Sequence, residues 1–380
     1  MNAPEPSPSL VPGGSDEQPT AGWHSIQVHY RKPDITPLLL DAVRPLFNHL
    51  APHVEAQYYM PHWRRGPHVR LQFKTTQEQF DHVVRPSAQR LIGHYLRDHP
   101  STEPYDEAAE LRIHERLAFT EWETGPLTPF HPDNSVQFEP FDDRKRILGS
   151  DDAVELLGWF HARSTPLAFQ ILSEAPERSQ RLAVAFDLMA ATSCLVFSVE
   201  RTANSYRSHS EAFIATSSDP DRTRAHLDRQ FVPRAAALRD RLAAVVAAVE
   251  ADSDTFAHVQ QWSVLVRELH QRGTALLKAG RISFNGTDTE REDLDEKAMT
   301  EEFFRRSPFH RSIDPAQYRE LLATVEYQAY RLVINSQYLL MTRIGLRPAD
   351  RFTLCHLVAG AGESFSGSAP SVPVGQRADS

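Results

Sequence analysis

Residues 56–73, AQYYMPHWRRGPHVRLQF, decide the fold. Two runs of alternating apolar and polar residues, 55–63 and 67–73, lie on either side of a tight basic turn that contains Gly66. Two such runs joined by a short turn with glycine predict a β-hairpin. The hairpin supplies two antiparallel strands, and the rest of the domain must be built around them.

The second strand of this hairpin has two different faces. Successive side chains of a strand point to opposite sides of the sheet, so alternate residues belong together. One face is apolar and holds Val69, Leu71 and Phe73, and the other is polar and holds His68, Arg70 and Gln72. The polar face is suited to binding a substrate, although a half-covered sheet with one solvated face gives the same pattern.

The sequence around the hairpin predicts an α+β layer. Residues 23–30 alternate and indicate a further strand, and residues 128–141 read as extended. Residues 34–50 and 75–98 have the spacing of apolar residues that is typical of helices, with a kink expected at Pro45. The order β-α-β-β-α predicts a small antiparallel or mixed sheet with packed helices.

From residue 150 onward the sequence is largely helical. Ser150 and Asp314 are suited to N-caps, and Pro315 stands at the first position of the helix after Asp314. We expect helices over residues 151–174, 177–203, 208–217, 221–250, 252–278, 314–342 and 348–360. The C-terminal two-thirds of the chain is therefore predicted to be mainly helical.

One catalytic domain is predicted, over residues 23–360, because no linker rich in Pro, Gly and Ser interrupts it. It consists of an α+β part, residues 23–149, and a mainly helical part, residues 150–360. Residues 1–22 and 361–380 are rich in Pro, Ser and Gly and are predicted to be disordered tails.

Bulk composition argues against several classes of protein. The formal net charge is −9 at pH 7, whereas a nucleic-acid binder needs a basic excess. The only two cysteines, Cys194 and Cys355, imply no disulfide framework and fit a reducing cytoplasm. Neither a signal peptide nor an apolar run of about 18–20 residues is present, so a membrane partner is not expected. The sequence leaves open whether the protein forms a homodimer.

Sequence motifs for cofactors and metals are absent. There is no GxGxxG after a strand, no GxxxxGK[ST] phosphate loop, no GxSxG nucleophile elbow, and no HExxH or CxxC. His49 and His53 are four residues apart, but no third ligand lies at a suitable spacing. We therefore expect neither a cofactor nor a metal.

The helix expected over 314–342 has two faces. One is an apolar stripe formed by Leu321, Leu322, Val325, Leu332, Leu339 and Leu340. The other carries Tyr327, Tyr330, Arg331, Gln337 and Tyr338, with Ser336 between the two. Such residues suit a polar cleft that binds peptide amides, but tyrosines packed beneath the polar segment 281–313 would give the same pattern. This segment is longer than an ordinary connection and is a candidate lid.

Three stretches together resemble a known family. The hairpin, with its aromatic strand, Arg/Gly turn and Pro-His-hydrophobic-Arg-Leu-x-Phe, resembles the elimination domain of class I lanthipeptide dehydratases, a fold that also stands alone in thiopeptide biosynthesis. Residues 138–172, which begin FEPFDDRKRILG, resemble the segment where that domain has Tyr-x-Pro-Glu and Arg-Tyr-Gly-Gly before a helix. Residues 334–357, INSQYLLMTRIGLRPADRFTLCHL, resemble its Asn-Arg-Leu-Gly segment and final helix. The resemblance spans about residues 23–360.

The sequence departs from the glutamate-eliminating members of this family where their chemistry lies. Those members hold a glutamate ester with arginines and move protons with a histidine. Here Arg70 keeps the first strand arginine, Gln72 replaces the second, Phe141 stands at the glutamate, Arg144 is the nearest later arginine, and Gln337 or Tyr338 falls at the histidine. These changes remove a carboxylate clamp and a base that acts near neutral pH.

The departures fit the stand-alone pyridine synthases. In those enzymes two dehydroalanines of a thiazole-rich precursor peptide join in a formal [4+2] aza-cycloaddition, and loss of water and leader peptide gives a pyridine-centred macrocycle. The resemblance implies no cofactor and a precursor peptide as partner. It implies catalytic roles for Tyr338, Tyr330, Gln337 and Ser336, and substrate-binding roles for Arg70, His68, Gln72, Tyr327 and Arg331.

Two other functions stay open at this point. One is a split lyase that eliminates glutamate from glutamylated Ser or Thr to make dehydroalanine, against which Gln72 and the missing histidine count. The other is a non-catalytic scaffold that binds the leader peptide, against which the polar face of the helix over 314–342 counts mildly.

Overall fold

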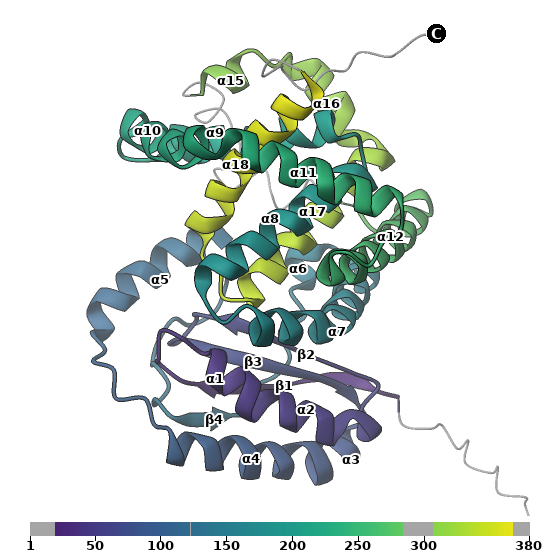
Figure 1. The fold of residues 1–380 in the computed structure, drawn as a ribbon. Helices are drawn as coiled ribbons and strands as arrows, with labels where there is room; N and C mark the ends of the chain where they lie inside the picture. Colours follow the sequence, from purple (N-terminus) through teal and green to yellow (C-terminus); the bar gives the residue numbers. More distant parts are fainter. Residues whose placement is uncertain (1–19, 122, 284–306, 368–380) are drawn as a thin grey trace, which may run out of the picture.

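The computed structural model describes residues 20–121, 123–283 and 307–367. Figure 1 shows a sheet with helices along its lower side and a larger helical part above it. This arrangement confirms the α+β class with a mainly helical C-terminal part. Most of the two predicted tails and of the predicted lid over 281–313 lies outside the described residues.

The sheet contains four antiparallel strands in the order β2-β3-β1-β4. They are β1 (Gly22–His29), β2 (Ala56–His62), β3 (His68–Thr75) and β4 (Ser135–Gln137). Strands β2 and β3 form the predicted hairpin, with His62 opposite His68 at its closed end. In the turn Gly66 has φ of 105°, a left-handed conformation that glycine adopts without a steric penalty.

Two continuous helical segments contribute the core that packs with the apolar face of the sheet. They are α1 (Thr36–Leu38), η1 (Leu39–Val43) and α2 (Arg44–Leu50), followed by η2 (Ala51–His53), and then α3 (Gln77–Gln79), η3 (Phe80–Val84) and α4 (Arg85–Asp98). Pro45 and Pro86 each stand at the start of an α-helix, directly after a π-helical turn. Because the turn changes the hydrogen-bond register, each helix continues past a proline that lacks an N–H.

The helical part contains the remaining elements. They are α5 (Glu107–Glu121), α6 (Lys145–Leu148), α7 (Asp151–Glu174), α8 (Arg178–Leu195), α9 (Val199–Thr216), α10 (Pro220–Phe231), η4 (Val232–Arg234), α11 (Ala235–Glu250), α12 (Ala257–Lys278), α15 (Pro308–Arg311), α16 (Pro315–Ala323), α17 (Val325–Arg343) and α18 (Pro348–Ser366). The predicted caps are confirmed, since Ser150 accepts a bond from Ala153 N and Asp314 accepts from Ala316 N and Gln317 N.

Several predicted helix boundaries were wrong. The helix expected over 314–342 is interrupted at Thr324, whose hydroxyl caps α17 by accepting from Tyr327 N. The helix expected over 177–203 ends earlier, because Ser198 caps α9 by accepting from Arg201 N. The last helix extends through Ser366, so it includes residues 361–366 of the predicted tail.

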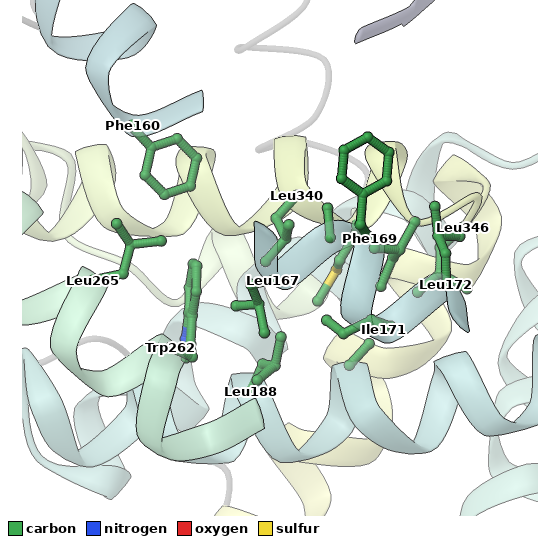
Figure 2. Packing of buried hydrophobic residues seen from close by; sticks show 14 of the residues in the cluster. Phe160, Leu167, Phe169, Ile171, Leu172, Leu188, Trp262, Leu265, Leu340 and Leu346 are labelled. Atoms are coloured by element: carbon green, nitrogen blue, oxygen red, sulfur yellow. The ribbon is translucent and has the colours of Figure 1, made fainter. Parts of the chain in front are cut away.

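Helix α7 links the sheet to the helical part. Figure 2 shows side chains of α7 packed with others from α8, α12 and α17. The labelled residues are Phe160, Leu167, Phe169, Ile171 and Leu172 of α7, with Leu188, Trp262, Leu265, Leu340 and Leu346. Trp262 donates its indole N–H to Thr192 Oγ1 at 2.9 Å, so the largest side chain of this cluster is satisfied. One cluster of buried hydrophobic residues contains members of both the α+β part and the helical part.

A glycine of α7 makes room for an aromatic side chain of β1. A Cβ at Gly158 would lie 2.7 Å from ring carbon Cζ2 of Trp23. The Trp23 ring has little room to move, because it stacks on Phe141 at 5.8 Å and meets Tyr58 edge-on at 5.2 Å.

We therefore expect Gly158→Ala to lower the free energy of unfolding by about 1–3 kcal/mol, the usual cost of overpacking. Urea denaturation measures this change. Gly93→Ala in α4 is the matched control, because its Cβ would meet only the flexible end of Arg97 at 3.6 Å, and helix propensity should make it neutral or stabilising. Equal stability of the two variants would contradict the packing argument.

Candidate functional site

The polar face of β3 is enclosed. His68, Arg70 and Gln72 are each no more than 5% exposed. Side chains from residues 123–144 lie over this face and over the neighbouring turn, among them Glu123, His131 and Asp142. The face is thus an interior polar surface, and the alternative of a solvated sheet face does not apply.

Arg70 lies at the centre of this surface. Its Nη1 is 3.5 Å from Asp142 Oδ2, and its Nε donates to His68 Nε2 at 3.4 Å. The other ring nitrogen of His68, Nδ1, is 2.8 Å from the carbonyl of Gly66 and donates to it in the tautomer that leaves Nε2 as acceptor. Burial lowers the pKa of the Arg70 guanidinium. The nearby Asp142 carboxylate opposes this shift, and the Arg64 guanidinium adds to it. Asp142 belongs to residues 138–172, the segment that resembles the family's Pro-Glu stretch. This segment therefore contacts Arg70 of β3.

A second acidic residue on this surface was not anticipated. The side chain of Glu123 is only 4% exposed and lies 3.6 Å from Arg64, 3.5 Å from Arg144 and 3.5 Å from His62. Two guanidinium groups and a histidine around one buried carboxylate hold the covering segment on the hairpin. An isolated glutamate in a loop carries no sequence signal, so only the tertiary contacts reveal it.

Four histidines gather at the same surface. The ring of His29 lies 4.7 Å from that of His68 and 4.5 Å from that of His131, and His62 lies 5.4 Å from His68. Burial lowers the pKa of His29 to about 3 and holds those of His62 and His68 well below 6.5. The neighbouring arginines act in the same direction, so these rings are neutral near pH 7.

This cluster predicts acid-sensitive folding. A histidine whose pKa is lower in the folded than in the unfolded chain disfavours folding once the unfolded form binds the proton. The stability that depends on neutral histidines is fully present above pH 6.5. It is lost as the pH falls toward the pKa values of the folded chain, which are about 3 for His29 and about 4 for His209, a further histidine, in α9. We therefore expect Tm to fall steadily between pH 7 and pH 4, and to fall less in a His29→Asn variant. A Tm that stays constant over this range would contradict the prediction.

The polar surface also holds buried side-chain atoms without a hydrogen-bond partner in the described part of the chain. They are His29 Nε2, His62 Nε2, Arg70 Nη2, Gln72 Oε1, Tyr105 OH, Glu123 Oε1 and His131 Nε2. Buried polar atoms are rarely left unsatisfied, and a concentration of them marks a place where a ligand or water is accommodated. Donors and acceptors of this kind match peptide amides.

The structure places the second group of predicted residues on α17, but not all of them in a cleft. Tyr330 and Gln337 are at most 1% exposed. Gln337 Nε2 donates to Tyr206 OH at 3.1 Å, and the Tyr330 ring stacks on Phe197 at 4.6 Å. Of the two interpretations of this helix, packing in the interior therefore holds for Tyr330 and Gln337, because α17 packs against α7, α8, α12, α16, α18 and β2.

Tyr338 differs from its neighbours because it is partly exposed and belongs to a polar chain. Its hydroxyl lies 2.6 Å from His209 Nδ1 of α9 and 3.3 Å from Cys355 Sγ of α18. The Arg351 guanidinium lies over its ring at 4.8 Å. Burial raises the pKa of Tyr338 well above 10 and lowers that of His209 to about 4, with Arg351 and Arg331 adding to the latter shift. Near pH 7 the tyrosine is therefore a protonated donor and the histidine a neutral acceptor.

The remaining predicted residues of this helix lie nearby. Arg331 is half-buried and close enough to His209 to lower its pKa. Tyr327 meets Tyr330 at 5.8 Å between ring centroids. Ser336 is 1% exposed and faces the interior. The structure thus groups Tyr338 and Arg331 around His209, while Ser336 and Gln337 lie in the core.

In the described part of the chain, the predicted residues of β3 are separate from the predicted residues of α17. No hydrogen bond, ion pair or ring contact there joins His68, Arg70 or Gln72 to Tyr338 or Gln337. The two regions are linked through Arg343 at the end of α17, whose carbonyl accepts from Tyr59 OH of β2 at 3.0 Å. Over residues 20–121, 123–283 and 307–367, no cluster of three or more His, Cys, Asp or Glu side chains is arranged to hold a metal ion.

The fold is thus a small antiparallel sheet with an interior polar face, joined to a larger helical part. The family model described as lantibiotic biosynthesis dehydratase C-term matches residues 23–361, so the chain belongs to this family. The resemblance stated from the sequence is thereby confirmed. No helix within the described residues has the length and apolar character to cross a membrane.

Solved structures show how closely the fold is shared. The chain is similar to a pyridine synthase, TbtD, from thiomuracin biosynthesis, with 33% identity and a TM-score of 0.74 over 91% of this chain and 99% of that chain. It also shares its fold with TsrL, at 21% identity and a TM-score of 0.65 over 92% and 96% of the two chains. The tRNA dependent lantibiotic dehydratase MibB from Microbispora sp. 107891 is similar at 13% identity and a TM-score of 0.50, over 94% of this chain and 29% of that one. None of the curated proteins matches the sequence.

Proposed function

We propose that the protein is a pyridine synthase that acts on a thiopeptide precursor peptide. It joins two dehydroalanines in a formal [4+2] aza-cycloaddition and then releases water and the leader peptide. The observation that carries this proposal is the similarity to a pyridine synthase along 91% of the chain and 99% of that enzyme. We further propose that it works in the cytoplasm, in keeping with its free cysteines.

The reaction balances without an oxidant or a cofactor. Two new bonds close a six-membered ring when one dehydroalanine, with its neighbouring amide as the iminol, adds to the other. Loss of the former amide oxygen as water and of the leader as a carboxamide then leaves the aromatic ring. These steps require precise positioning of two distant residues and proton transfer to the two leaving groups.

Tyr338 is suited to the proton transfers. Its hydroxyl stays protonated near pH 7 and hydrogen-bonds to His209 at 2.6 Å, so it can donate a proton and recover one from a defined neighbour. Gln337 and Ser336 belong to the same helix as Tyr338, and their buried side chains help to hold that helix in the core. Tyr330 is the less suited of the two tyrosines, because its ring is buried and stacked on Phe197.

Arg70, His68 and Gln72 are proposed to bind the peptide backbone. Arg70 Nη2 and Gln72 Oε1 have no hydrogen-bond partner among the described residues, and they offer one donor and one acceptor to an amide. Since the covering segment encloses them, the peptide would have to displace part of residues 123–144. Arg331 and Tyr327 would contact the peptide near Tyr338.

A direct assay tests the proposal. The purified protein is incubated with a synthetic leader-bearing peptide that contains thiazoles and two dehydroalanines, and mass spectrometry follows the products. We expect a leader carboxamide, and a macrocycle lighter than the substrate by that amide and one water.

Other outcomes would identify other functions. Conversion of a glutamylated peptide to dehydroalanine with release of glutamate would show a lyase, despite Gln72. A peptide that binds but stays unchanged in both forms would favour a scaffold.

A further inference from the structure

An open groove lies beside the edge of the sheet, apart from the Tyr338 chain. Its volume is about 760 Å³, and its walls come from α2, the start of β2, the end of β3 and α7. Figure 1 shows α7 between the sheet and the rest of the helical part. The residues already discussed as site residues do not line it, so it requires its own explanation.

The groove has an aromatic interior. Trp23 and Trp159 are half-buried, whereas Phe47 and Phe169 are buried. Two indole rings that border a groove, rather than filling a core, offer large flat surfaces at a low entropic cost to a ligand. The exposed parts of these rings are surfaces on which an apolar or aromatic side chain can pack.

The rim of the groove carries cationic side chains at two points, and also one exposed carboxylate, Glu55. Arg44 of α2 is half-buried and has no ion-pair or hydrogen-bond partner among the described residues. Arg163 of α7 is exposed, and its ion pair with Glu268 has a distance of 3.7 Å. Lys74 and Glu155, also at the groove, neutralise each other at 2.6 Å. The unpaired guanidinium of Arg44 matches a carboxylate of a ligand.

Backbone and side-chain groups in the groove can pair with an extended chain. Strand β2 is an edge strand, and its first residues, Ala56 and Gln57, line the groove. Gln57 Oε1 is buried without a hydrogen-bond partner. Opposite, Pro166 cannot donate to the carbonyl of Ala162, so α7 leaves that acceptor without its usual intrahelical partner. Edge strands with adjacent side-chain pockets are a recurrent way of binding extended peptides.

The groove adjoins the polar sheet face through a single aromatic wall. Trp23 lines the groove and contacts Tyr58, which lies opposite Gln72 in the β2–β3 register. Trp23 also stacks on Phe141, the residue before Asp142, which pairs with Arg70. The groove and the polar face therefore share the Trp23 side chain as a common wall.

We propose that this groove binds an extended segment of the leader peptide that carries an aromatic or large apolar side chain and at least one carboxylate. The inference rests on the proposed function for the identity of the ligand, but its test is a binding measurement that needs no turnover. Anchoring the leader here keeps it outside the reacting centre while the core closes into a ring.

The test uses the leader segment of the synthetic substrate, alone and fluorescently labelled, in an anisotropy titration against the full chain. We expect Arg44→Glu and Ala162→Phe each to weaken binding at least tenfold, the first by reversing the charge at the rim and the second by filling the groove. Arg90→Glu, an exposed arginine of α4 away from the groove, is the matched control and should bind like the unaltered protein. Raised salt should weaken binding in the unaltered protein more than in Arg44→Glu.

The outcomes separate this inference from the function. Equal affinity in all four proteins, or no binding of the leader alone, would overturn the groove as the leader site whether or not the enzyme cyclises its substrate. Binding that depends on the groove without any cyclisation would sustain the inference and overturn the proposed function. Circular dichroism at the titration temperature confirms that Ala162→Phe is folded, and Arg44→Glu gives an independent result if it is not.

Discussion

Replacing Tyr338 by phenylalanine is expected to lower kcat by about 100-fold, the lower end of the range for a general acid. The substitution keeps the ring and its contact with Arg351, and it removes only the hydroxyl that bonds to His209 at 2.6 Å. KM should change little, because the hydroxyl acts on leaving groups rather than on the bound peptide. Rates of macrocycle formation at several substrate concentrations measure both constants.

The role of His209 can be tested in the same assay. His209→Asn should also lower kcat, and the double variant should lose no more than about the larger single loss, because the two side chains act as one unit. Tyr95→Phe, in α4 at the other side of the sheet, is the control for removal of a tyrosine hydroxyl. If Tyr338→Phe keeps a third or more of the activity, Tyr338 is not the acid, and Tyr330 becomes the residue to examine.

The second large effect is on stability, at Arg343. This side chain is fully buried, its Nη1 donates to His161 O at 3.0 Å and Ser164 Oγ at 2.7 Å, and its guanidinium lies 4.7 Å from the centre of the Tyr59 ring. Burial lowers its pKa to about 10, so it is still charged near pH 7. Arg343→Ala removes these hydrogen bonds and opens a cavity where α7, α17 and β2 meet.

We expect Arg343→Ala to cost about 3–5 kcal/mol, a large share of the roughly 5–15 kcal/mol that a domain has in total. Arg343→Met fills the same volume and should cost clearly less. Arg239→Ala, which removes an exposed arginine paired with its neighbour Asp240, should stay within about 0.5 kcal/mol of the unaltered protein. Urea denaturation orders the three variants, and a loss below 1 kcal/mol in Arg343→Ala would contradict the assigned role.

The sequence predicted the sheet well because its signal is local. Alternation in residues 56–73 gave the hairpin and assigned His68, Arg70 and Gln72 to one face, and the β2–β3 register confirms both. Helix boundaries were harder, because a threonine or serine inside a helical pattern is either an interior residue or a cap. At Thr324 and Ser198 the side chain bonds forward to a backbone N–H, and the helix begins again there.

The candidate site was less predictable than the fold because it depends on contacts between distant residues. Periodicity separates two faces of a helix but does not say that both are buried, so Tyr330 and Gln337 were expected in a cleft. His209 is 129 residues from Tyr338 in the chain, and nothing in its local sequence marks it. Nothing in the local sequence marks Glu123 either, and only its contacts with Arg64 and Arg144 in the structure show its role. The sequence of one helix therefore identifies only one of the two residues in each of these contacts.

We expect Trp23 to couple ligand binding in the proposed leader groove to ligand binding at the polar sheet face. The same indole is packed against Gly158 on one side and against Phe141 and Tyr58 on the others, so it cannot adjust to a ligand in one space without changing the other. Linkage is reciprocal: if leader binding raises the affinity for the core, core binding raises the affinity for the leader by the same factor. If the leader binds in the groove as proposed, its release from the ring removes each fragment's contribution to the binding of the other, and we expect both products to leave more readily than the intact substrate.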